Sequence, residues 1–144
     1  MRVTLLATIL IAATSLLSVG CGGGIKDNEV KVSGNVTIDG QPIEIGSVSF
    51  VSADGSTPTG GGNIKDGAYV AFVAPGEKKV LVLGNKLVGK EKLYDTPDSP
   101  TRDMYEKVTP PEYNAVHLTP LTATINSEQD GLNFELTSKV KAKR

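Results

Sequence analysis

The side chains that most often carry catalysis are scarce in this sequence. Its 144 residues include one histidine, His117, and one cysteine, Cys21. Nucleophilic catalysis by serine or cysteine usually needs a histidine as the base and a third group that orients it. The chain has no Gly-x-Ser-x-Gly motif, and His117 lies in no familiar nucleophile motif. We therefore interpret His117 as a surface histidine at the edge of a strand, and we expect no catalytic residue.

Metal and phosphate sites also lack a complete set of residues. One cysteine and one histidine cannot form a His-only or Cys-rich transition-metal site, and the spacing of a calcium-binding loop is absent. Three aspartates could each place a carboxylate at a loop tip, but turn formation explains their Asp-Gly pairs: Asp54-Gly55, Asp66-Gly67 and Asp130-Gly131. The run from Gly60 to Gly62 lacks the lysine and hydroxyl of a phosphate-binding loop, so we interpret it as part of a flexible loop. We expect no metal and no cofactor.

The charge balance argues against a nucleic-acid partner. The chain has 15 Lys and Arg residues against 16 Asp and Glu residues, for a formal net charge of −1. Binding to nucleic acid needs a basic face that displaces counterions from phosphates. The one basic cluster is the tail, residues 139–144, which we interpret as a frayed end.

The first 20 residues have the layout of a helical secretory signal peptide. Arg2 and the α-amine precede an uncharged apolar run from Val3 to Leu17, and small residues then lead to Cys21. An uncleaved membrane helix is one alternative, although this run is at the lower limit of the roughly 20 residues needed to span a bilayer. Simple secretion, with an incidental thiol at Cys21, is the other.

The segment LLSVGC resembles the lipobox of bacterial lipoproteins. Gly20 and Cys21 match its strictest positions, whereas Ser18 departs from the usual leucine. The resemblance implies cleavage between Gly20 and Cys21, lipidation of Cys21 by acyl chains such as palmitate, and a flexible tether over residues 21–29. Position 22 lacks the acidic residue that retains such proteins in the inner membrane, so the outer membrane is favoured.

The remainder of the chain shows the two-residue periodicity of half-buried strands. Alternate residues from Val30 to Ile38 are apolar, and Asp39-Gly40 is typical of a type I′ turn. We expect a hairpin over residues 68–83 around Pro75-Gly76, and two final strands, 121–126 and 132–137. The predicted fold is all-β, a single antiparallel β-sandwich of about seven strands over residues 30–138, of the kind seen in immunoglobulin-like domains. The expected core is Val32, Val36, Ile38, Val48, Phe50, Val80, Val82, Phe134 and Leu136.

Residues 85–114 differ from the rest of the predicted domain. They hold Pro97, Pro100, Pro110 and Pro111 and many charged residues, and their apolar periodicity disappears. We interpret this segment as a long excursion from the sandwich, with a short helical turn over residues 102–108.

The order of the motifs resembles the carboxypeptidase-regulatory-like, transthyretin-related domain. The likeness lies in VSGNVTIDGQPIEIGSVSF and DGAYVAFVAPGEKKVLV and is carried by Gly34, Val36, Asp39, Gly40, Pro42, Gly46, Val48, Phe50, Gly67, Tyr69, Pro75, Gly76 and Val80. The closing segment is similar to that of short lipoproteins abundant in planctomycete-type bacteria, through Pro111, Tyr113, Asn114, Leu118, Thr119, Asn133, Phe134 and Leu136. The resemblance covers residues 30–137 and implies a prealbumin-like sandwich. It implies no known activity.

Two functions from different classes follow from these observations. The first is a membrane-anchored accessory, binding or structural module with an envelope protein or polysaccharide as partner, acting through loops or an edge strand. The alternative is an envelope enzyme that uses carboxylates of residues 85–114. We favour the first, because the sequence offers no nucleophile motif, phosphate loop or metal set.

Overall fold

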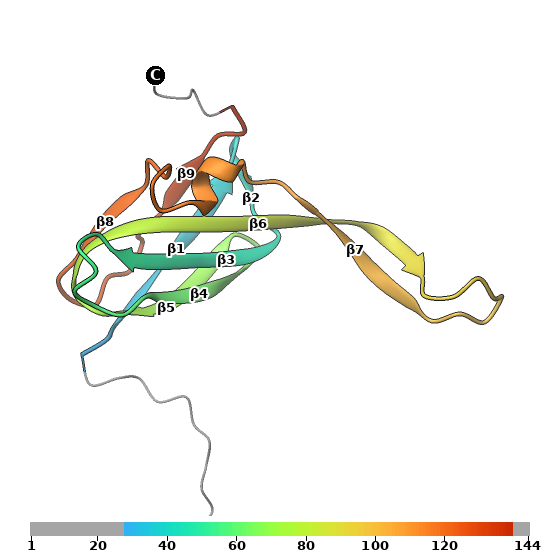
Figure 1. Ribbon diagram of the computed structural model, residues 1–144, viewed down its shortest axis with the longest axis horizontal. Coiled ribbons are helices and arrows are strands. Elements are labelled where there is room, and N and C mark those ends of the chain that lie inside the picture. Colours follow the sequence, from blue (N-terminus) through green and yellow to red (C-terminus); the bar gives the residue numbers. More distant parts are fainter. Residues whose placement is uncertain (1–27, 140–144) are drawn as a thin grey trace, which may run out of the picture.

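The structure is a computed structural model that describes residues 28–139. The predicted signal peptide, the processing site at Gly20 and Cys21, and the tail beyond Lys139 lie outside the described residues. Within them the chain is all β apart from one short 3₁₀ helix, as the alternation of apolar residues predicts (Figure 1).

The regular elements are short, except for one strand. They are β1 (Val30–Ile38), β2 (Gln41–Pro42), β3 (Ile45–Ser52), β4 (Gly60–Lys65), β5 (Ala68–Val73), β6 (Gly76–Lys92), β7 (Thr101–Lys107), the 3₁₀ helix η1 (Pro111–Asn114), β8 (Thr122–Ile125) and β9 (Phe134–Leu136).

The strands form a single nine-stranded sheet that curls around the core. Its order is β2-β1-β5-β4-β3-β6-β7, with β8 paired to β6 and β9 paired to β1. The β1–β9 pairing is parallel, and the other pairings between strands are antiparallel. The C-terminal segment therefore runs from β6, which pairs with β8, to β1, which pairs with β9.

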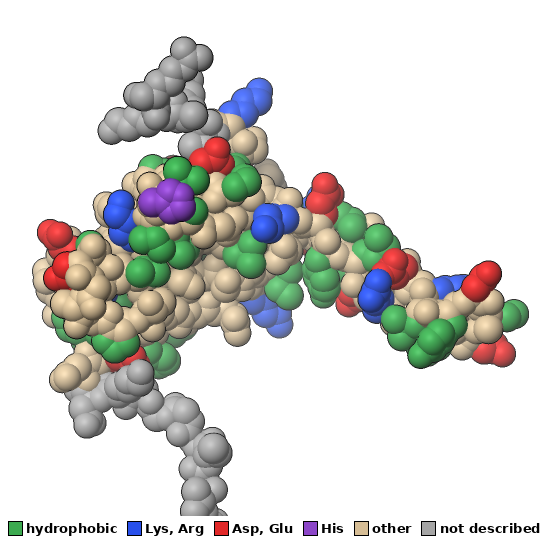
Figure 2. All heavy atoms as spheres, in the orientation of Figure 1, with side chains coloured by type: hydrophobic (Ala, Val, Ile, Leu, Met, Phe, Trp, Pro, Cys, Tyr) green, Lys and Arg blue, Asp and Glu red, His purple; other side chains and the backbone are tan. Residues whose placement is uncertain are grey.

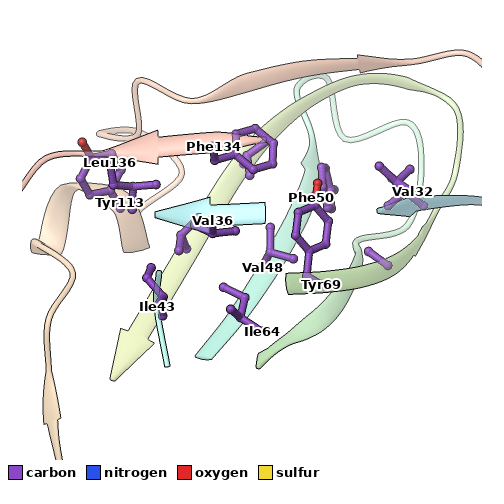
Figure 3. Packing of buried hydrophobic residues seen from close by; sticks show 14 of the residues in the cluster. Val32, Val36, Ile43, Val48, Phe50, Ile64, Tyr69, Tyr113, Phe134 and Leu136 are labelled. Carbon is purple, nitrogen blue, oxygen red and sulfur yellow. The ribbon is translucent and has the colours of Figure 1, made fainter. Parts of the chain in front are cut away.

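Three aromatic rings occupy the middle of the core. The ring centroids of Phe50, Tyr69 and Phe134 are each 6.2 Å from the other two (Figure 3). The predicted core residues are confirmed as buried, apart from Ile38, which is half-buried and packs against the others. The sequence pattern therefore identified the inward face of β1, β3, β6 and β9.

The predicted turns after β1 and β4 have the expected backbone. Asp39 and Gly40 have φ values of 49° and 81°, and Asp66 and Gly67 have 51° and 82°. A type I′ turn needs positive φ at both central residues, which Asp-Gly adopts at low cost. These two turns fix the registers of β1 with β2 and of β4 with β5.

The predicted hairpin over residues 68–83 is wrong. Strand β5 pairs with β1 and β4, whereas β6 pairs with β3, so the chain crosses over at Ala74 and Pro75. Side chains alternate between the two faces of a strand, so β5 and β6 bury the same residues whether they form a hairpin or are separated by a crossover. Periodicity alone therefore could not distinguish a hairpin from this crossover.

The interpretation of Gly60–Gly62 as loop residues is also wrong, because they begin strand β4. A Cβ atom added at Gly62 would lie 2.0 Å from the carbonyl oxygen of Val70, and one at Gly60 would lie 2.3 Å from that of Phe72. Only glycine allows β5 to approach β4 this closely. The glycine run is thus a packing feature of the sheet.

Residues 85–114 contain more regular structure than predicted. Strand β6 continues to Lys92, and residues 101–107 form strand β7 instead of the expected helical turn. The one helical turn lies further on, at η1. The apolar alternation disappears here because both faces of these strands are exposed, so no periodic pattern could mark them.

Candidate functional site: the β6–β7 arm

The sequence-predicted chemical residues do not come together in one site. His117 is exposed, but it lies in a turn after η1 and not at the edge of a strand as predicted. Within residues 28–139 there is no group of three or more His, Cys, Asp or Glu side chains that could hold a metal ion. In the same part of the chain, no helix has the length and apolar character needed to cross a membrane.

Asp54 and Asp130 stabilise loops through hydrogen bonds. Asp54 Oδ1 accepts hydrogen bonds from Ser52 Oγ at 2.6 Å and from the backbone N–H of Ser56 at 2.9 Å. The Ser52 and Ser56 contacts hold the pKa of Asp54 well below its usual value. Asp130 Oδ1 accepts a hydrogen bond from Ser33 Oγ at 2.5 Å. With the positive φ of Gly55, Gly67 and Gly131, these contacts support the interpretation of the three Asp-Gly pairs as turns.

Lys78 is a buried charged residue that the sequence analysis did not single out. It is 1% exposed, and its Nζ donates a hydrogen bond to Thr57 Oγ1. The sequence does indicate this burial, because Lys78 alternates with Val80 and Val82 on β6 and so lies on the same inward face. The contact ties the loop after β3 to β6. An amine this deeply buried is not accessible to a substrate, so we assign it a structural role.

The motif residues near the C-terminus are structural as well. Tyr113 is buried, and its hydroxyl oxygen accepts a hydrogen bond from the backbone N–H of Thr137 at 3.1 Å. Thr119 Oγ1 donates to the carbonyl of Val80 at 2.7 Å. Tyr69 donates to the carbonyl of Leu132 at 2.7 Å, and burial raises the pKa of its phenol. These groups hold the closing segment against the sheet.

The most distinctive surface is a two-stranded arm, residues 86–107, that projects from the curled body (Figure 1). Strand β3 ends its pairing with β6 at Ile45 opposite Asn85, and beyond this point β6 pairs with β7 alone. The backbone N–H of Val108 donates to the carbonyl of Gly84 at 2.9 Å at the base of the arm. At its far end, the backbone N–H of Leu93 donates to the carbonyl of Pro100 at 2.9 Å.

The arm concentrates exposed apolar side chains. Six of the eleven exposed large hydrophobic residues of the described chain lie there: Leu87, Val88, Leu93, Tyr94, Met104 and Tyr105. Charged side chains alternate with them (Figure 2). Lys90 pairs with Asp103 at 3.6 Å, and Arg102 pairs with Glu91. Every residue of β7 is exposed.

The two outer edges of the arm are not equivalent. The pairing of β6 with β7 skips Val88, which places a bulge in β6. Glu44 Oε2 also accepts a hydrogen bond from the backbone N–H of Leu87 at 3.3 Å, on the β6 side. Strand β7 has no such interruption between Thr101 and Lys107. The edge of β7 is therefore the better template for pairing with another strand.

A small groove lies at the base of the arm. It has a volume of about 230 Å³ and is lined by apolar Ile38, Pro42, Ile43 and Val108 together with polar Gln41, Glu44, Asn85 and Lys86. Lys86, at the start of the arm, is one of the residues that line this groove.

Comparisons with known proteins assign this chain to no family. No protein-family model matches the chain, and no curated protein matches it. A 9R-lipoxygenase from Cyanothece PCC8801 is similar in structure, with 12% sequence identity and a TM-score of 0.40. The similarity covers 76% of this chain but only 16% of the lipoxygenase. A TM-score this low supports no conclusion about function.

Proposed function

We propose that this protein is a lipid-anchored cell-envelope protein whose β-domain binds a partner through the β6–β7 arm and has no catalytic activity. The observation that carries the proposal is the arm itself, which exposes apolar side chains on a ribbon whose outer edges pair with no other strand of residues 28–139. Isolated two-stranded ribbons are at best marginally stable in water. A partner strand or surface would stabilise this one.

The anchor rests on the sequence LLSVGC and on the apolar run before it. Signal cleavage after Gly20 would leave Cys21 as the lipidated N-terminus, and the outer membrane is the favoured location. Substituting Cys21→Ser should abolish labelling with an acyl-chain probe and release the protein from the membrane fraction. Unchanged labelling of this variant would contradict the anchor.

We further propose that the curled sheet is a prealbumin-like sandwich related to the carboxypeptidase-regulatory-like domain of planctomycete-type lipoproteins. In support, the motif residues have structural positions: Val36, Val48, Phe50 and Val80 are in the core, and Gly40 and Gly67 are in turns. An experimental structure in which the strands form two separately packed sheets would support this relationship. A closed barrel would contradict it.

The enzyme alternative would need carboxylates of the arm to converge on a substrate. Glu91 is paired with Arg102, and Asp103 is paired with Lys90. Arg102 and Asp103 are consecutive in β7, so their side chains lie on opposite faces of the ribbon. Glu91 is directly opposite Arg102 and shares its face, so the carboxylates of Glu91 and Asp103 also project from opposite faces. This arrangement supports the binding function over catalysis.

The proposed function is tested by shortening the arm. Lys86 lies directly opposite Glu106, so a two-residue Asn-Gly link between them replaces residues 87–105 with a type I′ hairpin turn. A control variant, Val70→Ser, removes an exposed apolar side chain from the outer face of β5. Tagged full-length protein is then captured from its own envelope after cross-linking.

We expect the shortened variant to lose its cross-linked partner and the Val70→Ser variant to retain it. Capture that is unchanged by arm shortening would contradict the proposal. Turnover of an envelope-derived substrate that disappears with one point substitution would also contradict it.

A further inference from the structure

We infer that the arm binds a second copy of this chain, through antiparallel pairing of the two β7 strands about a two-fold axis at Met104. The inference rests on the proposed function, in which the arm is the binding surface. It is carried by the free edge of β7, by the order of its charges, and by its exposed apolar side chains.

The backbone of β7 has hydrogen-bonding groups available for this pairing. At either end of the arm, the even-numbered residues Pro100 and Val108 form backbone hydrogen bonds with the β6 side. Backbone groups alternate between the two edges of an antiparallel strand. The N–H and C=O groups of the odd-numbered residues therefore point to the free edge: Thr101, Asp103, Tyr105 and Lys107.

The charges of β7 are self-complementary when the two-fold axis lies at Met104. With Met104 opposite Met104 of the second copy, Arg102 lies opposite Glu106 of that copy, and the two-fold axis repeats this pair. Glu106 forms no ion pair among the described residues, so its carboxylate is available. Opposite charges directly across from each other stabilise an antiparallel pair.

Neighbouring registers fit less well. An axis at Asp103 would place two like carboxylates directly opposite each other, which is destabilising. An axis at Tyr105 would place Asp103 opposite Lys107, which is also an opposite-charge pair. It would, however, place Arg102 opposite Val108 and leave Thr101 unpaired, so that only residues 103–107 of β7 would pair with each other. Only the axis at Met104 pairs the whole strand from Thr101 to Lys107 with itself.

The same register gathers the apolar side chains of the arm. Leu87 lies directly opposite Tyr105 within one copy. Across the new pairing, Tyr105 of the two copies would be diagonal neighbours on that face, within reach of aromatic side chains. Met104 of the two copies would meet on the other face. Two marginal ribbons would become one four-stranded sheet with an apolar centre.

A membrane surface is a poorer occupant for the arm. Its tip carries the apolar Leu93 and Tyr94, but Asp95 and Asp98 lie beside them. Anionic lipid headgroups attract basic segments, and these carboxylates would oppose contact. Vesicle binding is therefore a control in the experiment below.

Single cysteines test both the dimer and its register. Each is introduced into the full chain carrying Cys21→Ser, so that it is the only thiol. Directly opposed Cβ atoms lie about 4.5–5.5 Å apart and diagonal ones about 7–8 Å, whereas a disulfide needs about 3.5–4.5 Å. Met104→Cys should form covalent dimers under mild oxidation, and Tyr105→Cys should form several-fold fewer. Equal cross-linking of the two variants, or none, would overturn the inference.

Charge exchange tests the pairing without a covalent bond. Either Arg102→Glu or Glu106→Arg alone places like charges opposite each other at both symmetry-related positions. Each substitution should therefore raise the dissociation constant of the dimer by about tenfold. An equimolar mixture of the two variants restores both opposite-charge pairs, and sedimentation should show heterodimers. Each substitution has the same effect on the structure of its own arm whether the variant is studied alone or in the mixture. Recovery of dimers on mixing therefore reports the contact between the two copies.

The outcomes separate this inference from the proposed function. The protein could sediment as a monomer and still need its arm for capture of an envelope partner. That result would overturn the inference and leave the proposed function standing. Arm-dependent binding to vesicles of anionic lipid, without dimers, also overturns it. Dimers that persist after the arm is shortened would overturn the inference, and envelope capture that also persists would contradict the proposed function as well.

Discussion

The two halves of strand β6 have similar extended backbones and opposite environments. Between Lys78 and Gly84 every second residue is buried, and β3 pairs along one side. Between Lys86 and Lys92 no residue is buried, and β7 is the one strand of the described chain that pairs with this half. The change occurs where the pairing with β3 ends, opposite Asn85. One strand therefore contributes to the core at one end and to an exposed surface at the other.

The difference shows that burial stabilises the body, whereas the arm depends on local pairs. In the arm, Lys90–Asp103, Glu91–Arg102 and Leu87–Tyr105 face each other across the two strands. Each such pair contributes roughly 0.2–1 kcal/mol, which is small beside the burial of a core aromatic side chain. Substitutions in the two regions should therefore have different effects on stability and on binding.

The largest effect on stability is expected at the centre of the core. Phe50→Ala removes the ring that packs between Tyr69 and Phe134, and it should lower the free energy of unfolding by about 3–5 kcal/mol. Tyr105→Ala in the arm should change it by less than about 0.5 kcal/mol. Denaturant titration measures both values. A near-zero loss for Phe50→Ala would show that its side chain is not part of the core.

A smaller effect compares the same substitution in the two halves of β6. Val82 is 0% exposed in the body, and Val88 is 50% exposed in the arm. Val82→Ala should cost about 1–3 kcal/mol, because two buried methyl groups are lost and a cavity forms. Val88→Ala should cost less than about 0.5 kcal/mol. Equal losses in thermal and denaturant unfolding would mean that the arm is packed as tightly as the body.

The smallest effect concerns the pH dependence of the body. Hydrogen bonds from Ser52 and Ser56 lower the pKa of Asp54 below the usual 3.8, so its contribution to stability is fully present above that value. The contribution is lost as the pH falls below that value and towards the pKa of the folded state. Asp54→Asn should therefore flatten the acid side of the stability curve without changing arm-dependent binding. An NMR titration that gives Asp54 its usual pKa would contradict this account.

The fold class, the core and two turns could be predicted from the sequence because each depends on local rules. Alternation marks Val32, Val36, Val80 and Val82 as inward, and Asp-Gly marks positive φ. The crossover at Ala74 could not be predicted, because a hairpin and a crossover bury the same face of β5 and β6.

The arm was missed for a different physical reason. Its strands bury neither face, so hydrophobic periodicity carries no signal there. The opposed charges of Lys90–Asp103 and Glu91–Arg102 could have indicated a ribbon, but only after a register was assumed. Lys78 was visible as a charged residue at an inward position of β6. The anchor at Cys21 lies outside residues 28–139 and stays a prediction.

The most direct test of the arm as the binding surface is photo-cross-linking in the native envelope. A photoreactive phenylalanine derivative replaces either Tyr105 in the arm, which is 51% exposed, or Val70 on the outer face of β5, which is 49% exposed. The matched exposure makes non-specific collisions equally frequent at the two positions. The account predicts a discrete adduct from position 105 and none from position 70. A discrete adduct from position 70, with none from position 105, would contradict it.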